Sequence, residues 1–263
     1  MKQFPFRVFL ALSVLVGAVA CGGGEAPAPS EEGAAAPAAA AATGTGSITG
    51  TILYTGGEDP DVVIDMAADP NCQALHAEPV YTEKVVADDA GHLANVFVYV
   101  KSGLEGKSFP TPSESVVLNQ QGCTYHPHVF GIMTGQDLVV HNSDETLHNI
   151  HATPDTNQEF NQGQPFQGME MTRTFDQVEV MVPFKCDVHS WMSAYVGVLD
   201  HPYFAVTGED GTFDIGNLPA GTYTVEAWHE TFGTRTQEVT IGDGESADFS
   251  FDYAGGGEAA PAG

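Results

Sequence analysis

The succession of short strand-like segments between about residues 46 and 253 restricts the fold of this chain more than any other feature. Residues 47–54 (SITGTILY) alternate apolar and polar side chains, and residues 94–100 (ANVFVYV) are a β-branched and aromatic run. Both patterns are typical of strands, and Gly, Asn and Asp turns separate the segments. No apolar-periodic segment is long enough for a crossover helix. We therefore predict an all-β protein built as an antiparallel sandwich or barrel.

The composition supports a folded core over most of the chain. Of 263 residues, 42% are hydrophobic and 10% aromatic, which excludes disorder throughout and allows one large domain or two ordinary ones. Two regions lack such side chains. Residues 21–45 are predicted to be a flexible Ala/Pro/Gly linker, and residues 254–263 a disordered tail.

Residues 1–20 have the pattern of a signal peptide. Lys2 and Arg7 precede a short apolar run that ends at Cys21. Small residues before a cysteine resemble the lipobox of bacterial lipoproteins. The resemblance implies cleavage before Cys21, a lipid on that residue, and a periplasm-side location in the cell envelope. Ordinary cleavage after the Ala-Val-Ala sequence is the alternative.

The charge balance restricts the partners. Eight Lys and Arg residues oppose 35 Asp and Glu residues, a net charge of −27. Nucleic acids and anionic lipid surfaces require basic side chains, so neither is expected as a partner, and membrane contact is expected only through the lipid anchor. An electrostatically attracted partner is expected to be cationic, such as a basic c-type cytochrome.

Two family resemblances suggest how the domains are arranged. Residues 206–225 (VTGEDGTFDIGNLPAGTYTV) and the opening 46–52 (GSITGTI) are similar to carboxypeptidase-regulatory-like, or transthyretin-like, β-sandwiches. The middle of the chain resembles a cupredoxin Greek-key sandwich. We therefore expect one sandwich from 46–115 with 202–253, and a cupredoxin domain from 116–201 inserted between its halves. Two sequential domains are the alternative.

A motif with Cys186, His189 and Met192 lies between two predicted strands, in FKCDVHSWM. Thiolate, imidazole and thioether ligands suit copper, which still needs a third equatorial ligand. His148 in NSDETLHN supplies it. These two stretches resemble the copper-binding segments of plastocyanin and amicyanin. The resemblance implies a mononuclear type 1 copper ion with His148, Cys186 and His189 as equatorial ligands and Met192 as the weak axial one.

The same resemblance assigns roles to neighbouring residues. Asn149 is expected to tie the ligand loops together by hydrogen bonds. His151 is the alternative to His148 as ligand, or it lies behind the ligands. A strand directs these two histidines to opposite faces, so only one of them can point at the metal, and the pairing with Asn149 favours His148. Electrons are expected to pass through the edge of His189, with Trp191 and Phe184 forming an apolar docking rim. Core packing is the alternative for Trp191.

Other metal chemistry fits the sequence less well. A binuclear copper centre needs a second cysteine in the loop, and a multicopper oxidase needs a His-Cys-His run and several His-x-His pairs. His126-Pro-His128 is the one such pair here. Zinc rarely accepts a thioether. The motif also provides no general base or nucleophile, so we predict that the protein is not an enzyme.

The remaining cysteines and histidines allow further expectations. Cys72 and Cys123 form an even pair in an oxidising compartment, which predicts a disulfide, although two separate thiols remain the alternative. His126 and His128 share a strand face, where either a second ion or ordinary polar contacts are expected.

The sequence thus predicts an exported, lipid-anchored blue copper protein that carries single electrons. The main alternative is a cell-envelope module that binds carbohydrate or cell-wall polymer and has an auxiliary copper site. An exposed row of aromatic residues on the strands of 206–250 would favour that alternative. Copper storage or delivery is a third possibility, and it predicts several open Met and His sites.

Overall fold

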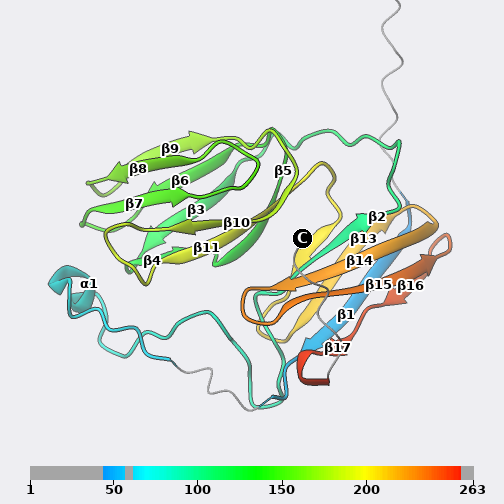
Figure 1. Cartoon of the computed structure of the whole chain (residues 1–263), viewed down its shortest axis with the longest axis horizontal. Helices are drawn as coiled ribbons and strands as arrows, with labels where there is room; N and C mark the ends of the chain where they lie inside the picture. The colour runs from blue at the N-terminus through cyan, green and yellow to red at the C-terminus, as the bar shows by residue number, and fades with distance from the viewer. Residues whose placement is uncertain (1–43, 57–61, 256–263) are drawn as a thin grey trace, which may run out of the picture. The chain divides into compact units, whose positions relative to one another are not determined.

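The computed structural model describes residues 44–56 and 62–255, and the prediction of an all-β protein is confirmed (Figure 1). The predicted signal peptide, the predicted lipidation site Cys21 and nearly all of the predicted linker lie outside these residues. At the other end, Tyr253–Gly255 form a short 3-10 helix, so the first two residues of the predicted tail are ordered. None of the helices in the described ranges has the length and apolar character needed to cross a membrane.

Eight strands form what we call the outer sandwich. One of its sheets has the order β13-β1-β16, with β17 also pairing with β1, and the other has the order β12-β2-β14-β15. The strands are β1 (Gly46–Leu53), β2 (Phe97–Ser102), β12 (Phe204–Val206), β13 (Thr212–Leu218), β14 (Gly221–His229), β15 (Gly233–Ile241), β16 (Ser246–Asp248) and β17 (Phe251–Asp252). Apolar side chains of both sheets, such as Ile48, Val98 and Val225, form one buried cluster.

The nine strands between β2 and β12 form the inner sandwich. Its sheets have the orders β5-β11-β10-β7-β8 and β4-β3-β6-β9. The strands are β3 (Val116–Gln121), β4 (Thr124–His126), β5 (Val129–Met133), β6 (Leu138–Asn142), β7 (His148–Ala152), β8 (Phe160–Gln164), β9 (Glu170–Arg173), β10 (Glu179–Lys185) and β11 (Ser193–Leu199). Leu118 and Val140 from one sheet and Val182 and Val196 from the other belong to its core.

The expectation of purely antiparallel sheets is wrong in one respect. The pairs β3–β6, β5–β11, β1–β16 and β1–β17 are parallel. Each of these pairs joins strands that are separated along the chain by other strands, so no tight hairpin forces an antiparallel arrangement.

The two sandwiches contact each other through aromatic side chains and a pair of glycines. Gly131 on β5 and Gly197 on β11 are direct neighbours in the sheet. A Cβ atom at Gly131 would lie 2.2 Å from the Phe204 ring, and one at Gly197 would lie 2.3 Å from the Phe97 ring. The missing side chains therefore let these two aromatic rings of the outer sandwich pack directly on the inner sheet.

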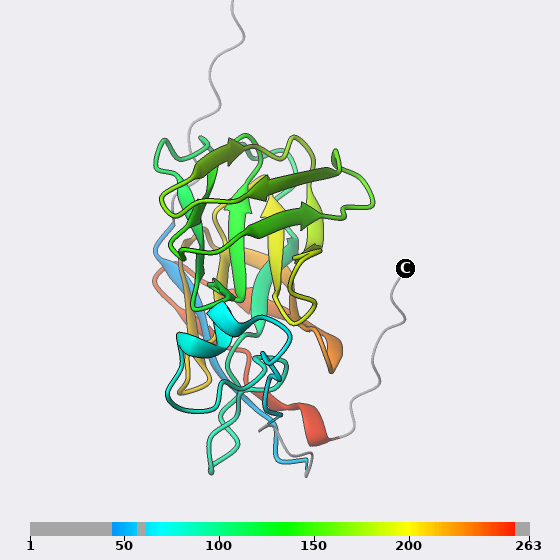
Figure 2. The ribbon, with the colours of Figure 1, turned by 90° about the vertical axis from the view of Figure 1, so that its left-hand side faces the viewer.

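Residues 62–82, which we call the strap, connect β1 towards β2 but contact the end of the inner sandwich. The strap contains the short helix α1 (Pro70–Ala74), which the strand pattern did not predict. Ile64, Met66 and Cys72 of the strap pack with Cys123 and Trp191 of the inner sandwich. Figure 2 shows α1 beside the end of that sandwich. A segment expected to belong to the outer sandwich thus covers one end of the inner one.

Candidate metal centre

The loop between β10 and β11 holds Cys186, His189 and Met192. The backbone N–H of Met192 donates to the carbonyl of His189 at 3.0 Å, and that of Cys186 donates to the carbonyl of Met192 at 3.3 Å. The backbone N–H of His189 lies 3.3 Å from the sulfur of Cys186. These contacts fold seven residues into a compact turn, so that Cys186, His189 and Met192 are all buried.

His148 brings the second half of the site from another strand. It is the first residue of β7, which pairs with β8 on one side and with β10 on the other. Its Nδ1 lies 3.0 Å from Nδ1 of His189, which in turn lies 3.9 Å from Sγ of Cys186. Two imidazole nitrogens and a thiol therefore converge within 4.8 Å of one another, all on buried residues.

Met192 is 1% exposed and belongs to the same apolar cluster as Cys186. The same loop therefore contributes a buried thioether side chain in addition to the thiol and the two imidazoles, and these are the residue types that the sequence predicted as ligands. This set of soft and borderline donors suits copper and fits zinc poorly.

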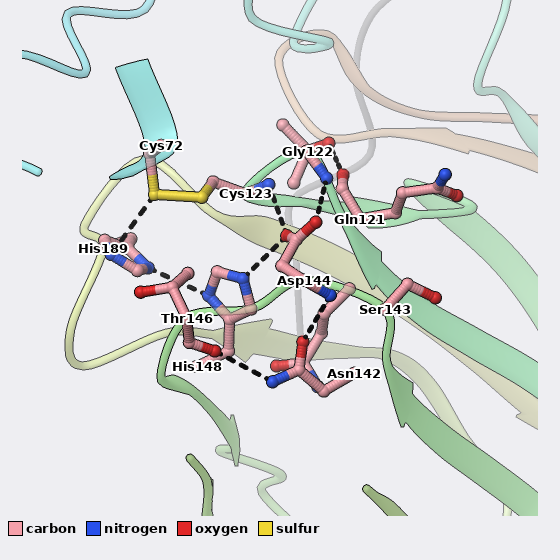
Figure 3. A network of polar contacts seen from close by, with 12 residues as sticks. Cys72, Gln121, Gly122, Cys123, Asn142, Ser143, Asp144, Thr146, His148 and His189 are labelled. Carbon is pink, nitrogen blue, oxygen red and sulfur yellow. Dashed lines mark hydrogen bonds and ion pairs between the residues drawn. A yellow bond between two sulfur atoms is a disulfide. The ribbon is translucent and has the colours of Figure 1, made fainter. Parts of the chain in front are cut away.

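A carboxylate contacts Nε2 of each imidazole, on the side opposite the Nδ1 atoms that converge. Nε2 of His148 lies 2.8 Å from Oδ2 of Asp144, and Nε2 of His189 lies 2.9 Å from Oδ2 of Asp69 (the Asp144 contact is drawn in Figure 3). Because a carboxylate only accepts hydrogen bonds, both Nε2 atoms donate. In a neutral imidazole the opposite nitrogen, Nδ1, then presents a lone pair. Two lone pairs aimed at each other beside a thiol fit a bound cation.

The pKa values of these groups follow from burial and from their partners. Burial alone would raise the pKa of the Cys186 thiol, but its contact with the His148 imidazole and hydrogen bonds from backbone N–H groups outweigh burial and lower that pKa. Burial also opposes the charged form of His148, yet the Asp144 carboxylate raises its pKa. The hydrogen bond from His189 lowers the pKa of Asp69. The surroundings thus favour the thiolate, the form of cysteine that binds metals.

Asn149 connects the two halves of the site. Its side-chain oxygen accepts a hydrogen bond of 2.6 Å from the backbone N–H of Asp187, next to Cys186. Its amide group donates to Asn161 on β8, and its own carbonyl accepts from the hydroxyl of Tyr125. The position of Asn149 is therefore that of a residue tying the ligand loops together.

His151 lies outside the cluster that His148, Cys186 and His189 form. Its Nδ1 contacts the carboxylate of Asp187 at 3.0 Å, and its Nε2 contacts Glu159 at 2.9 Å. The alternation of side chains along β7 turns it away from His148, so it does not replace that ligand.

The possible second metal site at His126 and His128 is not formed. Nε2 of His126 contacts the hydroxyl of Thr124 at 2.7 Å at the surface. His128 is instead buried, with Nδ1 3.0 Å from the carbonyl of Ser193 and Nε2 against the carboxylate of Glu230. The alternative of ordinary polar contacts describes these two histidines.

The expected docking rim requires correction. His189 and Phe184 are each only 1% exposed. Phe184 packs among Phe130, Phe160 and Phe175 in the inner core, so it cannot form a surface. Trp191 is partly buried and donates its indole N–H to the carbonyl of Cys123 at 2.9 Å.

The strap is the physical reason that the edge of His189 is covered. Cys72 on α1 forms a disulfide with Cys123, with their Cα atoms 5.6 Å apart. The Cys72 sulfur lies 3.5 Å from Nε2 of His189 (Figure 3). An edge that the family resemblance expects at the surface is here enclosed by a sulfur, a carboxylate and an indole ring.

Asp69 and Asp144, which contact the two candidate ligand histidines, are residues that the sequence reasoning missed. Asp144 stands inside the NSDETLHN stretch, four residues before His148, so its proximity to that ligand was a readable signal. Asp69 lies 120 residues from His189. Its sequence context, an Asp-Pro pair before Cys72, indicates only the start of a short helix.

The comparisons with known proteins include both families that the sequence resembles. The model of the carboxypeptidase regulatory-like domain matches residues 193–253. The match starts on β11, which hydrogen-bonds to β5 and β10 in the inner sandwich, and leaves out β1, which pairs with β13 and β16 in the outer one. A search among curated proteins finds no match.

Similar solved structures include a purple cupredoxin from Nitrosopumilus maritimus, with 19% identity and a TM-score of 0.28 over 32% of this chain and 99% of that one. An oxidised amicyanin mutant has 19% identity and a TM-score of 0.29 over 32% of this chain and 81% of that one. The copper nitrite reductase of Thermus scotoductus has 16% identity and a TM-score of 0.30, over 38% of this chain and 26% of that one. Similarities this distant carry no weight for function.

Proposed function

We propose that this protein is a type 1, or blue, copper protein that carries single electrons and has no catalytic reaction of its own. The observation that carries the proposal is the convergence of Nδ1 of His148, Nδ1 of His189 and Sγ of Cys186 in a buried space. When bound there, copper supplies a Cu(II)/Cu(I) couple that accepts and releases one electron.

The protein's own residues prepare the site for that couple. His148 at the start of β7 and Cys186 and His189 in the loop between β10 and β11 provide three donors, and Met192 in that loop adds a soft thioether. Asn149 fixes the distance between β7 and the Cys186 loop. The buried setting excludes water and limits rearrangement of the donors, which keeps the geometry similar in both oxidation states.

The test is the visible spectrum of the purified protein titrated with Cu(II). One copper per chain should give an intense blue or purple colour from thiolate-to-copper charge transfer. Cys186→Ser should abolish it, because the described residues contain no other free cysteine. His151→Gln is the matched control, since His151 faces Asp187 and Glu159, and it should keep the colour. A colourless one-copper protein, or an unchanged Cys186→Ser spectrum, would contradict the proposal.

We further propose that the mature protein is lipid-anchored at Cys21 in the bacterial cell envelope. The apolar run before Cys21 and the linker after it support this location. The Cys72–Cys123 disulfide supports an oxidising compartment. In membrane fractionation, the wild type should be found in the membrane fraction, and Cys21→Ala should be found in the soluble fraction. Equal membrane association of both would contradict the anchor.

The proposed partner is a cationic redox protein, such as a basic c-type cytochrome. The net charge of −27 supports long-range attraction. Leu147 and Val188, each one residue before a ligand histidine, are 43% and 47% exposed and offer apolar contact near the site. Stopped-flow reduction by such a cytochrome should slow as salt rises, because the screening length is about 8 Å at physiological ionic strength. A reduction rate that stays constant or rises with salt would contradict the proposal that the acidic charge attracts the partner.

The alternative of a carbohydrate-binding module gains no support from the outer sandwich. Phe213, Tyr223 and Phe249 are buried in its core. The large apolar side chains that are exposed in the described residues all lie outside 206–250. No exposed aromatic row is therefore present on these strands in the described part of the chain.

A further inference from the structure

The strap places one acidic side chain against the metal centre from outside the inner sandwich. Oδ2 of Asp69 accepts a hydrogen bond from Nε2 of His189 at 2.9 Å. Its other oxygen, Oδ1, accepts from the backbone N–H groups of Asn71 and Cys72, at 2.8 and 3.4 Å, and so caps α1. Both carboxylate oxygens are therefore committed, one to the helix and one to the ligand histidine.

The second ligand histidine is held in a parallel way. Oδ2 of Asp144 accepts from Nε2 of His148, and the same oxygen accepts from the backbone N–H of Cys123 at 2.8 Å. Each half of the disulfide thus donates its backbone N–H to the carboxylate behind one ligand. Cys72 donates to Asp69 and Cys123 donates to Asp144, so the disulfide couples the two supports.

We propose that Asp69 is a positioning residue for the copper centre, delivered by the disulfide-anchored strap. This rests on the proposed copper function. Asp69 fixes His189 as the Nε2–H tautomer with its Nδ1 lone pair towards the metal, and its negative charge behind the imidazole favours Cu(II) over Cu(I).

The physical basis is general for metal-bound histidines. A ligand imidazole that donates its distal N–H to a carboxylate is fixed in tautomer and orientation and becomes a stronger donor, and loss of such a partner typically lowers metal affinity about 10–100-fold. A stronger nitrogen donor and an added negative charge both stabilise the more highly charged ion, which is Cu(II).

Two substitutions separate the possible roles of Asp69. Asp69→Ser keeps a helix-capping oxygen, because Ser is a favoured N-cap residue, but its short side chain no longer reaches His189. The amide side chain of Asp69→Asn has a single oxygen, which cannot both cap α1 and accept a hydrogen bond from His189. If that oxygen caps α1, the amide NH₂ faces His189 and stabilises the opposite tautomer, with the proton on Nδ1. Asp65→Asn, on the same exposed strap, is the control for removal of one charge.

The first measurement uses the full-length mature protein without metal, so it is independent of copper loading. Nitrogen-15 NMR of the imidazoles should show His189 as the Nε2–H tautomer in the wild type and in Asp65→Asn. The signal should become a tautomer mixture in Asp69→Ser and shift to Nδ1–H in Asp69→Asn.

The second measurement is the reduction potential of the copper-loaded variants. Asp69→Ser should raise the ratio of Cu(I) to Cu(II) affinity about tenfold, which equals about 59 mV for a one-electron couple. Asp69→Asn should also lose Cu(II) affinity, by about 10–100-fold. Asp65→Asn should leave the reduction potential and the Cu(II) affinity unchanged. Thermal melts should show that all variants are folded.

The outcomes distinguish this inference from the proposed function. Wild-type protein that binds no copper but shows the predicted tautomers would overturn the function and keep the role of Asp69 in orienting His189. A blue wild type whose tautomer and potential are unchanged in Asp69→Ser and Asp69→Asn would overturn the role of Asp69 and keep the function.

Discussion

Among the described residues, three histidines are buried with a carboxylate at Nε2, yet they divide into two kinds. His148 and His189 have their Nδ1 atoms 3.0 Å apart, beside a thiol. Nδ1 of His128 instead lies 3.0 Å from the carbonyl of Ser193, while its Nε2 contacts Glu230. Burial next to a carboxylate is therefore common to both kinds. The difference is that Nδ1 of His148 and Nδ1 of His189 converge beside the Cys186 thiol, whereas Nδ1 of His128 contacts a backbone carbonyl.

The location of the two kinds explains their difference. His128 lies between β4 and β5 of the inner sandwich, whereas Glu230 follows β14 of the outer one, and the hydroxyl of Tyr195 donates to the same carboxylate at 3.2 Å. This pair joins the two sandwiches. The ligand histidines lie instead at the end of the inner sandwich that the strap covers.

The largest expected effect separates the two kinds directly. His148→Ala removes a convergent nitrogen and should lower Cu(II) affinity by more than about 100-fold, beyond the loss typical of a supporting residue. His128→Ala should keep one tightly bound copper per chain and lose stability instead. Copper titration with a competing chelator, together with urea unfolding, measures both. If His128→Ala keeps its fold but loses copper, His128 is not a purely structural histidine and the division into two kinds is wrong.

The next effect concerns the disulfide, whose Cys72 sulfur lies 3.5 Å from Nε2 of His189. It closes a loop with a sequence separation of 51 residues. A double substitution, Cys72→Ser with Cys123→Ser, should lower the free energy of unfolding by about 4 kcal/mol. The copper spectrum should change as well, because the backbone of each cysteine supports a carboxylate behind a ligand. A destabilised variant with a wild-type spectrum would show that the disulfide does not couple the two supports.

A smaller loss of stability is expected when the structural pair is broken. Glu230→Gln replaces the charged partner of buried His128 and should lower the free energy of unfolding by about 2 kcal/mol. The copper spectrum should be unchanged, because the hydrogen bonds of His128 and Glu230 go to each other, to the Ser193 carbonyl and to the Tyr195 hydroxyl and not to a candidate ligand side chain. Urea unfolding and visible absorption on the same samples check this. A shifted copper spectrum would mean that the two histidine groups are coupled.

The smallest effect is the pH dependence of this pair. Burial opposes the charge of His128, but Glu230 and then Glu83 outweigh it and raise its pKa. His128 likewise lowers the pKa of Glu230 against the effect of burial. Of the other groups here, Tyr195 has its pKa raised to about 12, and burial lowers the pKa of His229 to about 4, so both stay neutral near pH 6.

The sign of the pH dependence follows from these directions. The contribution of His128 is complete below its ordinary value of 6.5 and is lost as pH rises through the raised pKa. The contribution of Glu230 is complete above its ordinary value of 4.5 and is lost as pH falls through the lowered pKa. The stability difference between wild type and Glu230→Gln should therefore be largest between these values and shrink above neutral pH. A difference that grows steadily from pH 6 to 9 would contradict the pair.

The sequence by itself determined the features that depend on local pattern. The period-two alternation and turn residues define an all-β chain, because they record which face of each strand is buried. The three candidate ligands Cys186, His189 and Met192 lie within seven residues, so one loop between two strands brings them together. His148 was found because it stands in a recognisable stretch at the start of a strand.

The tertiary structure alone decided what surrounds these ligands. Strand pattern does not encode that the strap folds over His189, that Asp69 accepts from its Nε2, or that Phe184 points into the core rather than to a surface. Polar contacts across 120 residues depend on how the chain packs, and a single carboxylate in a polar segment has no period that could reveal its partner. Local periodicity therefore predicts elements and loops, whereas the supports behind a ligand are fixed only when separate segments meet in space.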